Sequence, residues 1–276
     1  MDAADSWRDD LRRRAIPPPI LKAAPESPWG CPVEVFRSRA DRAREGPATP
    51  TTARALEVLP SGGTVLDVGC GAGATSLPLA DRAGTMIGVD AASDMVAAFV
   101  EAVNGVGRVV ATVEGSWPEI AADAPPADVV VCGHVLYNVQ ELVPFVQALD
   151  EHARRRVVLE LTEHHPLRWM NDLWLRFHDV VFPEGPTAEV AEQVLRDAGH
   201  DAHRDERPPD DLRGHGGFAR RGDAVALIRR RLCLGPDRDD EVAAALGDLL
   251  HRDDRGRWSA GPGGQAVVTL WWDAVP

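Results

Sequence analysis

The chain has 276 residues, 44% hydrophobic and 26% charged, a composition typical of a globular protein that can bury a full core. Its 30 Lys and Arg against 43 Asp and Glu give a formal net charge of −13, which disfavours nucleic acid because a phosphate backbone binds clustered cations. The sequence has no signal-peptide pattern, no apolar run near the roughly 20 residues of a membrane span and only scattered cysteines, so we expect a cytoplasmic protein without a membrane partner.

The first 50 residues are irregular and interrupted by prolines. Because proline is costly inside a helix, we expect a short helix at 6–14, an extended crossing, and a second helix at 32–44. The segment carries Trp7, Trp29 and Phe36, and leaving such aromatic surface in water is unfavourable by about 25 cal/mol per Å². The segment should therefore pack back onto the rest of the chain.

Two elements lead into the most informative motif. Thr49 and Pro50 are typical residues of a helix start, and the helix that they open should end before Pro60. The next stretch, 64–68, is a short apolar run of the kind that is buried in a parallel sheet. We expect a strand there.

A glycine-rich turn ends this strand. Gly69, Gly71 and Gly73 permit backbone angles that side chains forbid and allow a ligand to approach the main chain closely. A helix predicted at 75–82 would add free N–H groups, so the turn favours a nucleotide-like ligand. With Ala74 in the third position, the turn also fits the dinucleotide fingerprint, so the glycines alone leave the cofactor open.

The following stretch alternates strands with helices. The predicted strands are 85–90, 108–113, 127–132 and 156–161, with helices at 92–104 and 143–152. Strands joined by crossover helices end at one edge of a sheet, where open α/β folds bind their ligands. Asp90 lies at this edge, where a carboxylate can accept hydrogen bonds from both hydroxyls of a ribose; it could also cap the next helix.

Proton-accepting side chains follow two of these strands. His134 and Tyr137, the only tyrosine, come after the fourth strand, and His164 and His165 come after the fifth. Each could act as a base, although a histidine near a strand end is often a hydrogen-bonded core residue. We expect no metal, because adjacent histidines on an extended chain point to opposite sides and no third ligand is suitably spaced.

The last hundred residues begin with a helical pattern at 167–178, which carries Trp169, Trp174 and Phe177 just past the sheet edge. These aromatics predict either one wall of a substrate pocket or plain core packing. The remaining predicted elements are helices at 188–198, 225–232 and 239–250, a sixth strand before 209, and a last strand at 265–272. The order of elements predicts an α/β fold with a doubly wound, mostly parallel seven-stranded sheet, helices on both faces, an N-terminal helical cover and a C-terminal helical insertion.

The run Leu66-Asp67-Val68-Gly69-Cys70-Gly71-Ala72-Gly73 resembles motif I of the class I S-adenosylmethionine-dependent methyltransferases, and the resemblance extends over about 49–162. Asp67 supports this cofactor, because a carboxylate at this place suits a cationic amino group better than a pyrophosphate. The resemblance implies a set of cofactor-binding residues: Asp67, Gly69, Gly71 and Gly73 for the methionyl part, Asp90 for the ribose, Ala91, Ser116 and Trp117 around the adenine, and Gly133 and His134 beside the sulfonium. Ser116 stands where the family often has an aspartate, and Trp117 could equally be a core residue.

The resemblance implies transfer of a methyl group from S-adenosylmethionine to an oxygen, nitrogen or carbon of a small, partly apolar or aromatic metabolite or natural product, with S-adenosylhomocysteine as the second product. Close alignment of the reacting atoms could lower the barrier by up to roughly 7–11 kcal/mol, so no base is obligatory. If the acceptor must lose a proton, the candidates are His134, Tyr137, His164 and His165. The resemblance also makes the N-terminal segment a cover for the pocket. The substrate-binding candidates are Trp29, Phe36, Trp169, Trp174 and Phe177.

Two alternatives stay open at this point. One is a domain that binds S-adenosylmethionine or S-adenosylhomocysteine without catalysis, and the other is an NAD-dependent oxidoreductase, for which no separate catalytic half is evident. We expect one domain, with a cover at 1–50, a cofactor-binding core at 51–163, and substrate-side helices and last strands at 164–276. The expected assembly is a monomer or homodimer.

Overall fold

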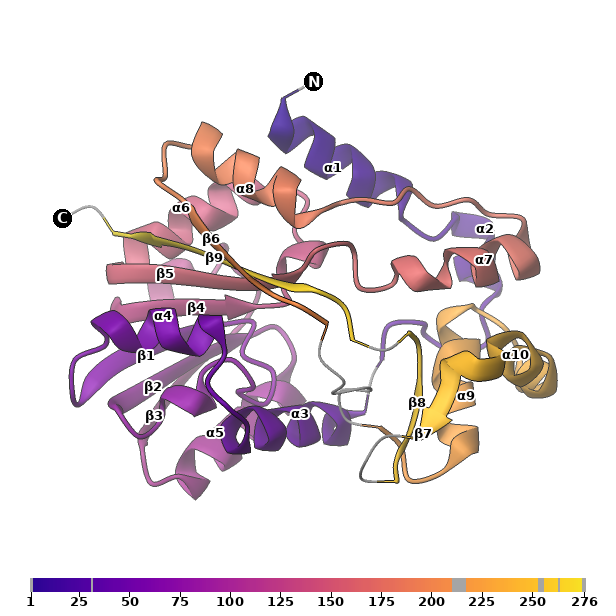
Figure 1. Ribbon diagram of the computed structural model, residues 1–276, viewed down its shortest axis with the longest axis horizontal. Coiled ribbons are helices and arrows are strands. Elements are labelled where there is room, and N and C mark those ends of the chain that lie inside the picture. Colours follow the sequence, from indigo (N-terminus) through magenta and orange to yellow (C-terminus); the bar gives the residue numbers. More distant parts are fainter. Residues whose placement is uncertain (1, 31, 210–216, 253–255, 263, 275–276) are drawn as a thin grey trace.

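The computed structural model describes residues 2–30, 32–209, 217–252, 256–262 and 264–274 (Figure 1). Its centre is a seven-stranded sheet with the spatial order β3-β2-β1-β4-β5-β9-β6, in which β9 runs antiparallel to both of its neighbours. The strands are β1 (Gly63–Val68), β2 (Ala83–Asp90), β3 (Val109–Glu114), β4 (Ala127–Gly133), β5 (Ala153–Thr162), β6 (His203–Arg207) and β9 (Val267–Asp273). The predicted doubly wound, mostly parallel sheet is confirmed.

Helices cover both faces of the sheet (Figure 1). One layer contains α1 (Ala3–Arg13), α6 (Leu142–His152) and α8 (Ala188–Asp197), and the other contains α3 (Val33–Glu45), α4 (Pro50–Val58) and α5 (Ser93–Gly105). The central strands are apolar at successive positions because both of their faces are buried. Val129, Val130 and Val131 of β4 all lie fully inside the protein.

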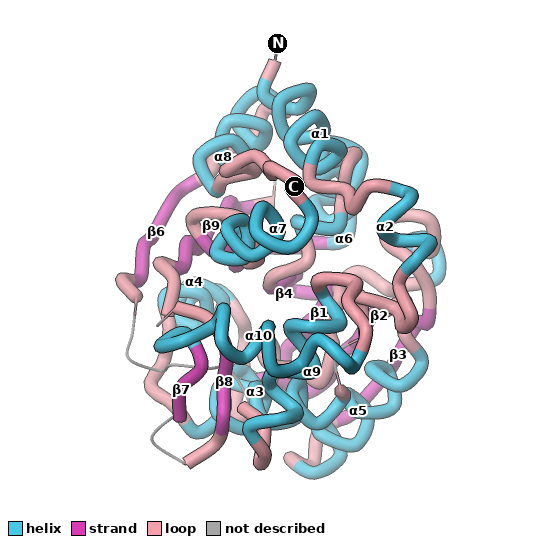
Figure 2. The backbone as a smooth tube through the Cα atoms, turned by 90° about the vertical axis from the view of Figure 1, so that its right-hand side faces the viewer, coloured by secondary structure: helices cyan, strands magenta, loops and turns pink. Residues whose placement is uncertain are grey.

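A separate hydrophobic cluster lies beyond the carboxyl ends of the parallel strands, on the right of Figure 1 and facing the viewer in Figure 2. We call its elements the cap: α2 (Pro18–Ala23), α7 (Asn171–His178), α9 (Arg221–Arg231), α10 (Asp239–Leu246) and the hairpin of β7 (Leu250–Arg252) and β8 (Trp258–Ala260). The sequence predicts most of the helices of the cap but not its hairpin. α10 is shorter than predicted because Gly247, at φ +49°, ends it.

Two predicted conformations are wrong. The stretch 75–82 contains only a short 3₁₀ turn instead of an α-helix, because Pro78 has no N–H to donate and its ring disfavours the helix interior. The predicted extended crossing contains α2, which begins at Pro18, a residue type that is favourable in the first turn of a helix. The 3₁₀ turns are η1 (Leu77–Leu79), η2 (Ala121–Asp123), η3 (Leu136–Asn138), η4 (Arg168–Met170), η5 (Pro236–Arg238) and η6 (Gly247–Leu249).

The N-terminal segment packs onto the body, as its aromatic residues predict. Trp7 is fully buried, and its indole N–H donates to the carbonyl of Val139 at 2.8 Å. Arg8 adds an ion pair with Glu141 at 2.7 Å, so α1 is fixed against the layer that contains α6 and α8. Among the described helices, none combines the length and apolar character required to cross a bilayer.

Candidate functional site

The glycine turn lies at the carboxyl end of β1, where the strand order reverses between β1 and β4. Gly69, Gly71 and Gly73 have φ angles of +71°, +50° and +89°, which only glycine adopts without strain. The backbone N–H of Gly69 donates to the carbonyl of Val89 at 2.7 Å and anchors the turn to the neighbouring strand. In open α/β sheets, a ligand binds in the crevice outside such a point of reversal.

Close packing against the exit of β4 also requires glycine. A Cβ on Gly69 would lie 2.2 Å from Cγ2 of Val135, and a Cβ on Gly133 would lie 2.1 Å from Oγ1 of Thr75. Neither contact is compatible with a side chain. The residues after β4 are therefore held directly against the glycine turn.

Asp90 stabilises the turn from the end of β2. Its two carboxylate oxygens accept hydrogen bonds from the backbone N–H groups of Gly71 at 2.9 Å and Ala92 at 3.0 Å. The carboxylate is partly exposed, and Ala91 beside it is exposed, so both can face a ligand. Asp90 thus stabilises the turn from the position predicted for a ribose contact, and the ribose contact itself stays a prediction. The N-cap of α5 is Ala92 and has no side-chain cap hydrogen bond, so Asp90 does not cap that helix.

Asp67 lies beneath the turn and is only 1% exposed. One carboxylate oxygen accepts a hydrogen bond from Oγ of Ser76 at 2.5 Å, and the other has no hydrogen-bond partner among the described residues. Burial, opposed by the Ser76 hydrogen bond and aided by the charge of Asp90, raises the pKa of Asp67 to about 7. Asp67 therefore supports the turn from inside the protein, and its predicted contact with a methionyl group stays a prediction.

The N-terminal helix α3 reaches the outer side of the turn. Cδ1 of Phe36 lies 3.5 Å from the place that a Cβ on Gly71 would occupy. Phe36 therefore covers the glycine turn, which agrees with its position in a cover but places it at the proposed cofactor end. Trp29, the other aromatic substrate candidate of this segment, is 59% exposed.

The two residues predicted to close the adenine side differ in their surroundings. Ser116 is exposed. Trp117 is buried in the core; its indole N–H donates to the carbonyl of Phe145 at 3.3 Å and its ring meets His152 edge-on. Trp117 is therefore a core residue here, and its prediction as a ring contact for adenine finds no support in this arrangement.

His134 forms the most distinctive polar contact of this edge. It has φ +60°, an uncommon left-handed conformation for a non-glycine residue that costs about 1 kcal/mol. Its Nε2 lies 3.2 Å from Oε1 of Glu160 on β5, and Oε2 of Glu160 accepts a hydrogen bond from Thr51 at 2.5 Å. Burial alone would raise the pKa of Glu160, but the hydrogen bonds from His134 and Thr51, together with the positive charges of His134 and Arg207, outweigh it and lower this pKa to about 2.

Sequence reasoning did not single out Glu160 or Thr51. One signal was available for Glu160, because it is a charged residue inside the apolar run of the fifth strand, where an unpaired charge would be costly. Thr51 gave none, since a threonine in the first turn of a helix is ordinary.

Two of the predicted proton acceptors, Tyr137 and His165, lie largely inside the protein. Tyr137 is 8% exposed and hydrogen-bonds with Thr162 at 2.6 Å, and burial raises the pKa of its hydroxyl above its usual range. His165 packs edge-on against the Tyr137 ring; burial, aided by the charge of Arg14, lowers its pKa to about 3. The packing gives the Tyr137 hydroxyl a role in the core, and its predicted role as a base gains no support from this arrangement.

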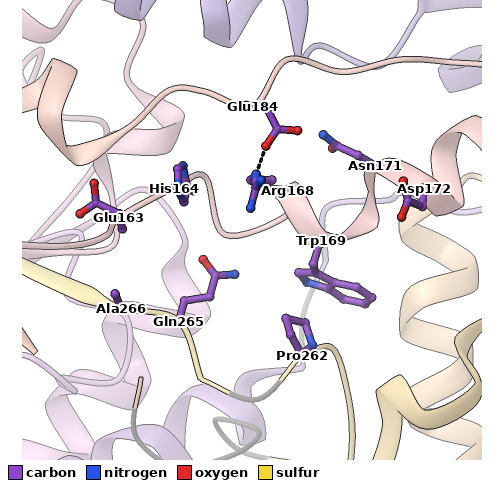
Figure 3. A pocket seen from close by; sticks show the side chains of 10 residues that line it. All are labelled: Glu163, His164, Arg168, Trp169, Asn171, Asp172, Glu184, Pro262, Gln265 and Ala266. Carbon is purple, nitrogen blue, oxygen red and sulfur yellow. Dashed lines mark hydrogen bonds and ion pairs between the residues drawn. The ribbon is translucent and has the colours of Figure 1, made fainter. Parts of the chain in front are cut away.

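A cavity of about 490 Å³ opens beside the ends of β5 and β9 (Figure 3). Figure 3 shows His164 and Trp169 on one side of it and Gln265 and Pro262 on the other. Nδ1 of His164 is buried and has no hydrogen-bond partner among the described residues. Arg168, which lies between His164 and Trp169 in Figure 3, forms an ion pair with Glu184.

Only part of the predicted aromatic wall lines this cavity. Trp169 does, whereas Trp174 is 5% exposed and packs against Phe182 and His178 inside the cap. Phe177 is also packed in the cap. For Trp174 and Phe177 the core alternative is therefore the one that the packing supports. In the described parts of the chain, no three His, Cys, Asp or Glu side chains gather as metal ligands.

Comparison with known proteins gives a family for the central part of the chain. Residues 65–156, which contain the glycine turn, Asp90 and His134, match the family described as "Methyltransferase domain". The chain carries a methyltransferase domain. Members of this family use S-adenosylmethionine, so the predicted family and its cofactor are confirmed at the level of the family.

The sequence is also similar to an uncharacterized protein of Haemophilus influenzae, with 31% identity over 103 residues. This match covers 37% of the present chain and 38% of that relative. The match therefore spans little more than a third of either protein, and it carries no information about a substrate.

Solved structures similar to the methyltransferase domain and its surroundings support the fold. The cyclopropane-fatty-acyl-phospholipid synthase-like protein from Lactobacillus casei has a TM-score of 0.52 at 17% identity, covering 87% of this chain and 92% of its own. The YcgJ protein from Bacillus subtilis has a TM-score of 0.51 at 16% identity, covering 82% and 98%. A proposed methyltransferase from Bacillus halodurans has a TM-score of 0.51 at 14% identity, covering 81% and 98%.

Proposed function

We propose that this protein transfers the methyl group of S-adenosylmethionine to a small-molecule acceptor. The observation that carries the proposal is the glycine turn inside the matched methyltransferase segment, with Gly69, Gly71 and Gly73 all at positive φ at the point of strand reversal. Asp90, at the rim of the turn, has a carboxylate that is partly open. Such a site suits an adenosine-bearing ligand.

The bound cofactor supplies an electrophilic methyl group on a positively charged sulfur. The residues of this chain would hold the cofactor and align the acceptor, and alignment alone can lower a barrier by several kcal/mol. Gly133 ends β4 against the turn and His134 follows it, so they would lie next to the sulfur when the methionyl part fills the turn. Phe36 would cover the same end from α3.

The cavity beside β5 supports an acceptor of metabolite size. Its volume of about 490 Å³ is within the usual range of small-molecule sites. His164, Asn171 and Gln265 offer hydrogen-bonding groups at its wall, and Trp169 offers an apolar surface. This combination favours an acceptor that has both polar groups and an apolar or aromatic part.

Calorimetry with S-adenosylmethionine, S-adenosylhomocysteine and NAD tests the cofactor. We expect both adenosyl compounds to bind and NAD not to bind. A metabolite extract incubated with the protein and S-adenosylmethionine should then yield a compound heavier by one methylene, absent when either component is omitted. Binding of NAD instead would support an oxidoreductase, and tight S-adenosylhomocysteine binding with no methylated product from any extract would support the non-catalytic alternative.

A further inference from the structure

His134 is held at the rim of the glycine turn by its two neighbours. Gly133 lies against Thr75 so closely that no Cβ fits, and Cγ2 of Val135 fills the space that a Cβ on Gly69 would need. The left-handed backbone of His134 turns its side chain out of the path of the strand, and that side chain is 45% exposed. The ring therefore projects from the turn instead of packing in the core.

Glu160 fixes this ring from one side only. Its side chain is 15% exposed, and Oε1 lies 3.2 Å from Nε2 of His134. Oε2 is occupied by Thr51 at 2.5 Å, and Thr51 is in turn within 2.8 Å of Thr269 on β9. The backbone N–H of His134 also donates to the carbonyl of Glu160 at 2.7 Å. The carboxylate is thus contacted by His134 on one oxygen and by Thr51 of α4 on the other, and the contact of Thr51 with β9 helps to hold it facing His134.

We propose that Glu160 is a positioning residue: it orients His134, which takes a proton from the compound that receives the methyl group. This inference rests on the proposed function. A carboxylate only accepts hydrogen bonds, so the 3.2 Å contact with Glu160 suits a proton on Nε2 of His134, and the proposed step requires Nδ1 to keep its lone pair. The acceptor is therefore a compound whose methylated atom is an oxygen or nitrogen that bears a proton.

The proposed methyl transfer needs only the acceptor, S-adenosylmethionine and His134. The O–H or N–H proton of the acceptor moves to Nδ1 of His134, and the freed lone pair of the acceptor forms a bond to the methyl carbon. The carbon–sulfur bond breaks, and its electron pair stays on sulfur to give the neutral thioether of S-adenosylhomocysteine. Glu160 stabilises the imidazolium that forms, and water later removes the proton.

Nuclear magnetic resonance of protein labelled with ¹⁵N at its nine histidines tests the arrangement, with S-adenosylhomocysteine as the bound probe. The His134 signals are assigned by their loss in His134→Gln. We expect His134 in the wild type to be neutral at pH 7.5–8, with the proton on Nε2, a low-field N–H resonance typical of a bond to a carboxylate, and an unprotonated Nδ1. A proton on Nδ1, in a neutral or a charged ring, would overturn the proposal.

Glu160→Gln removes the charge with little change of shape, and we expect the low-field Nε2–H resonance to move upfield or disappear. The matched control is Glu192→Gln, which alters another buried carboxylate, paired with Arg196 and Arg204, and should leave the His134 signals unchanged. An unchanged resonance in Glu160→Gln contradicts the proposal. Calorimetry on the same samples separates the two hypotheses: failure to bind S-adenosylhomocysteine counts against the proposed function, while the signals of His134 report on Glu160 even in the free protein.

Discussion

Both carboxylate oxygens of Asp90 accept hydrogen bonds from backbone N–H groups, and one of these N–H groups belongs to the glycine turn. Asp90→Ala removes these hydrogen bonds and the proposed ribose contact together. Because hydrogen bonds to a charged group contribute about 1.5–3 kcal/mol, S-adenosylhomocysteine should bind about 10- to 100-fold more weakly by calorimetry. Asp81→Ala, which changes an exposed carboxylate at the other end of β2, should bind normally. Unchanged affinity in Asp90→Ala would remove the ribose assignment.

His134 should matter for the rate more than for cofactor binding. With an acceptor found by the methylene-gain screen, His134→Ala should lower kcat about 10²- to 10⁴-fold while S-adenosylhomocysteine affinity stays nearly intact. The measurement is steady-state kinetics together with calorimetry. A large loss of affinity at unchanged kcat would instead mean that His134 binds the methionyl carboxylate.

Asp67 should give the stability of the protein a pH dependence of definite sign. Its pKa is raised to about 7 in the folded protein, whereas an unfolded aspartate titrates near 3.9. From about pH 4 to pH 7 the folded protein therefore holds a proton that the unfolded chain has lost, so stability falls as the pH rises through this range, by roughly 4 kcal/mol at most. Urea unfolding of wild type and Asp67→Asn at pH 4.5 and 7.5 measures this, because only the wild type should show this contribution. Equal pH dependence in the two proteins would contradict it.

The polar residues at the sheet edge show what a sequence can reveal about a site. The place of Asp90 could be predicted because a residue that directly follows a buried parallel strand lies at the edge of the sheet where ligands bind. Trp117 and Tyr137 could not be assigned, since the sequence does not say toward which side of a strand exit a ring turns, and both turned into the core. Glu160 was missed because its role depends on a contact with His134, which lies 26 residues earlier in the chain, just after the neighbouring strand β4.

At the scale of elements, α1 should contribute strongly to stability through one side chain. Trp7 is fully buried between helices and hydrogen-bonded to Val139, so Trp7→Ala should lower the free energy of unfolding by about 3–5 kcal/mol. Trp29→Ala is the matched control, because Trp29 is 59% exposed and should change stability by no more than about 0.5 kcal/mol. Urea unfolding measures both; similar effects for the two would mean that α1 is not docked as described.

The elements themselves were predictable where one local signal dominated. The buried strands β1, β2, β4 and β5 are short apolar runs in the sequence, and each of them was predicted. The errors arose where two signals competed. The stretch after the glycine turn has a helical pattern, but Pro78 removes the hydrogen bond on which a helix would depend. The hairpin of β7 and β8 is too short to show a period in the sequence.

The chain as a whole has three runs of arginine, at 12–14, 154–156 and 229–231, which could give a local positive patch despite the net charge of −13. One buried arginine in each of the last two runs is paired with carboxylates inside the protein. Arg156 is 6% exposed and pairs with Glu57 at 2.7 Å and Asp273 at 2.8 Å. Arg229 is 5% exposed and pairs with two carboxylates at 2.9 and 3.1 Å. These two arginines are therefore buried and paired with carboxylates, so they do not offer a positive charge to a phosphate group.

The protein should consequently not bind RNA or DNA at physiological salt. Non-specific binding depends on the release of counterions by clustered cations, and this chain offers a net excess of 13 negative charges instead. In a filter-binding or fluorescence-anisotropy titration, any association with a mixed-sequence RNA seen at low salt should vanish by about 0.2 M salt. A basic RNA-binding protein measured in parallel supplies the positive control. A footprint on RNA that survives this salt concentration would mean that the acceptor is a nucleic acid, and the metabolite-sized cavity beside β5 would then need another role.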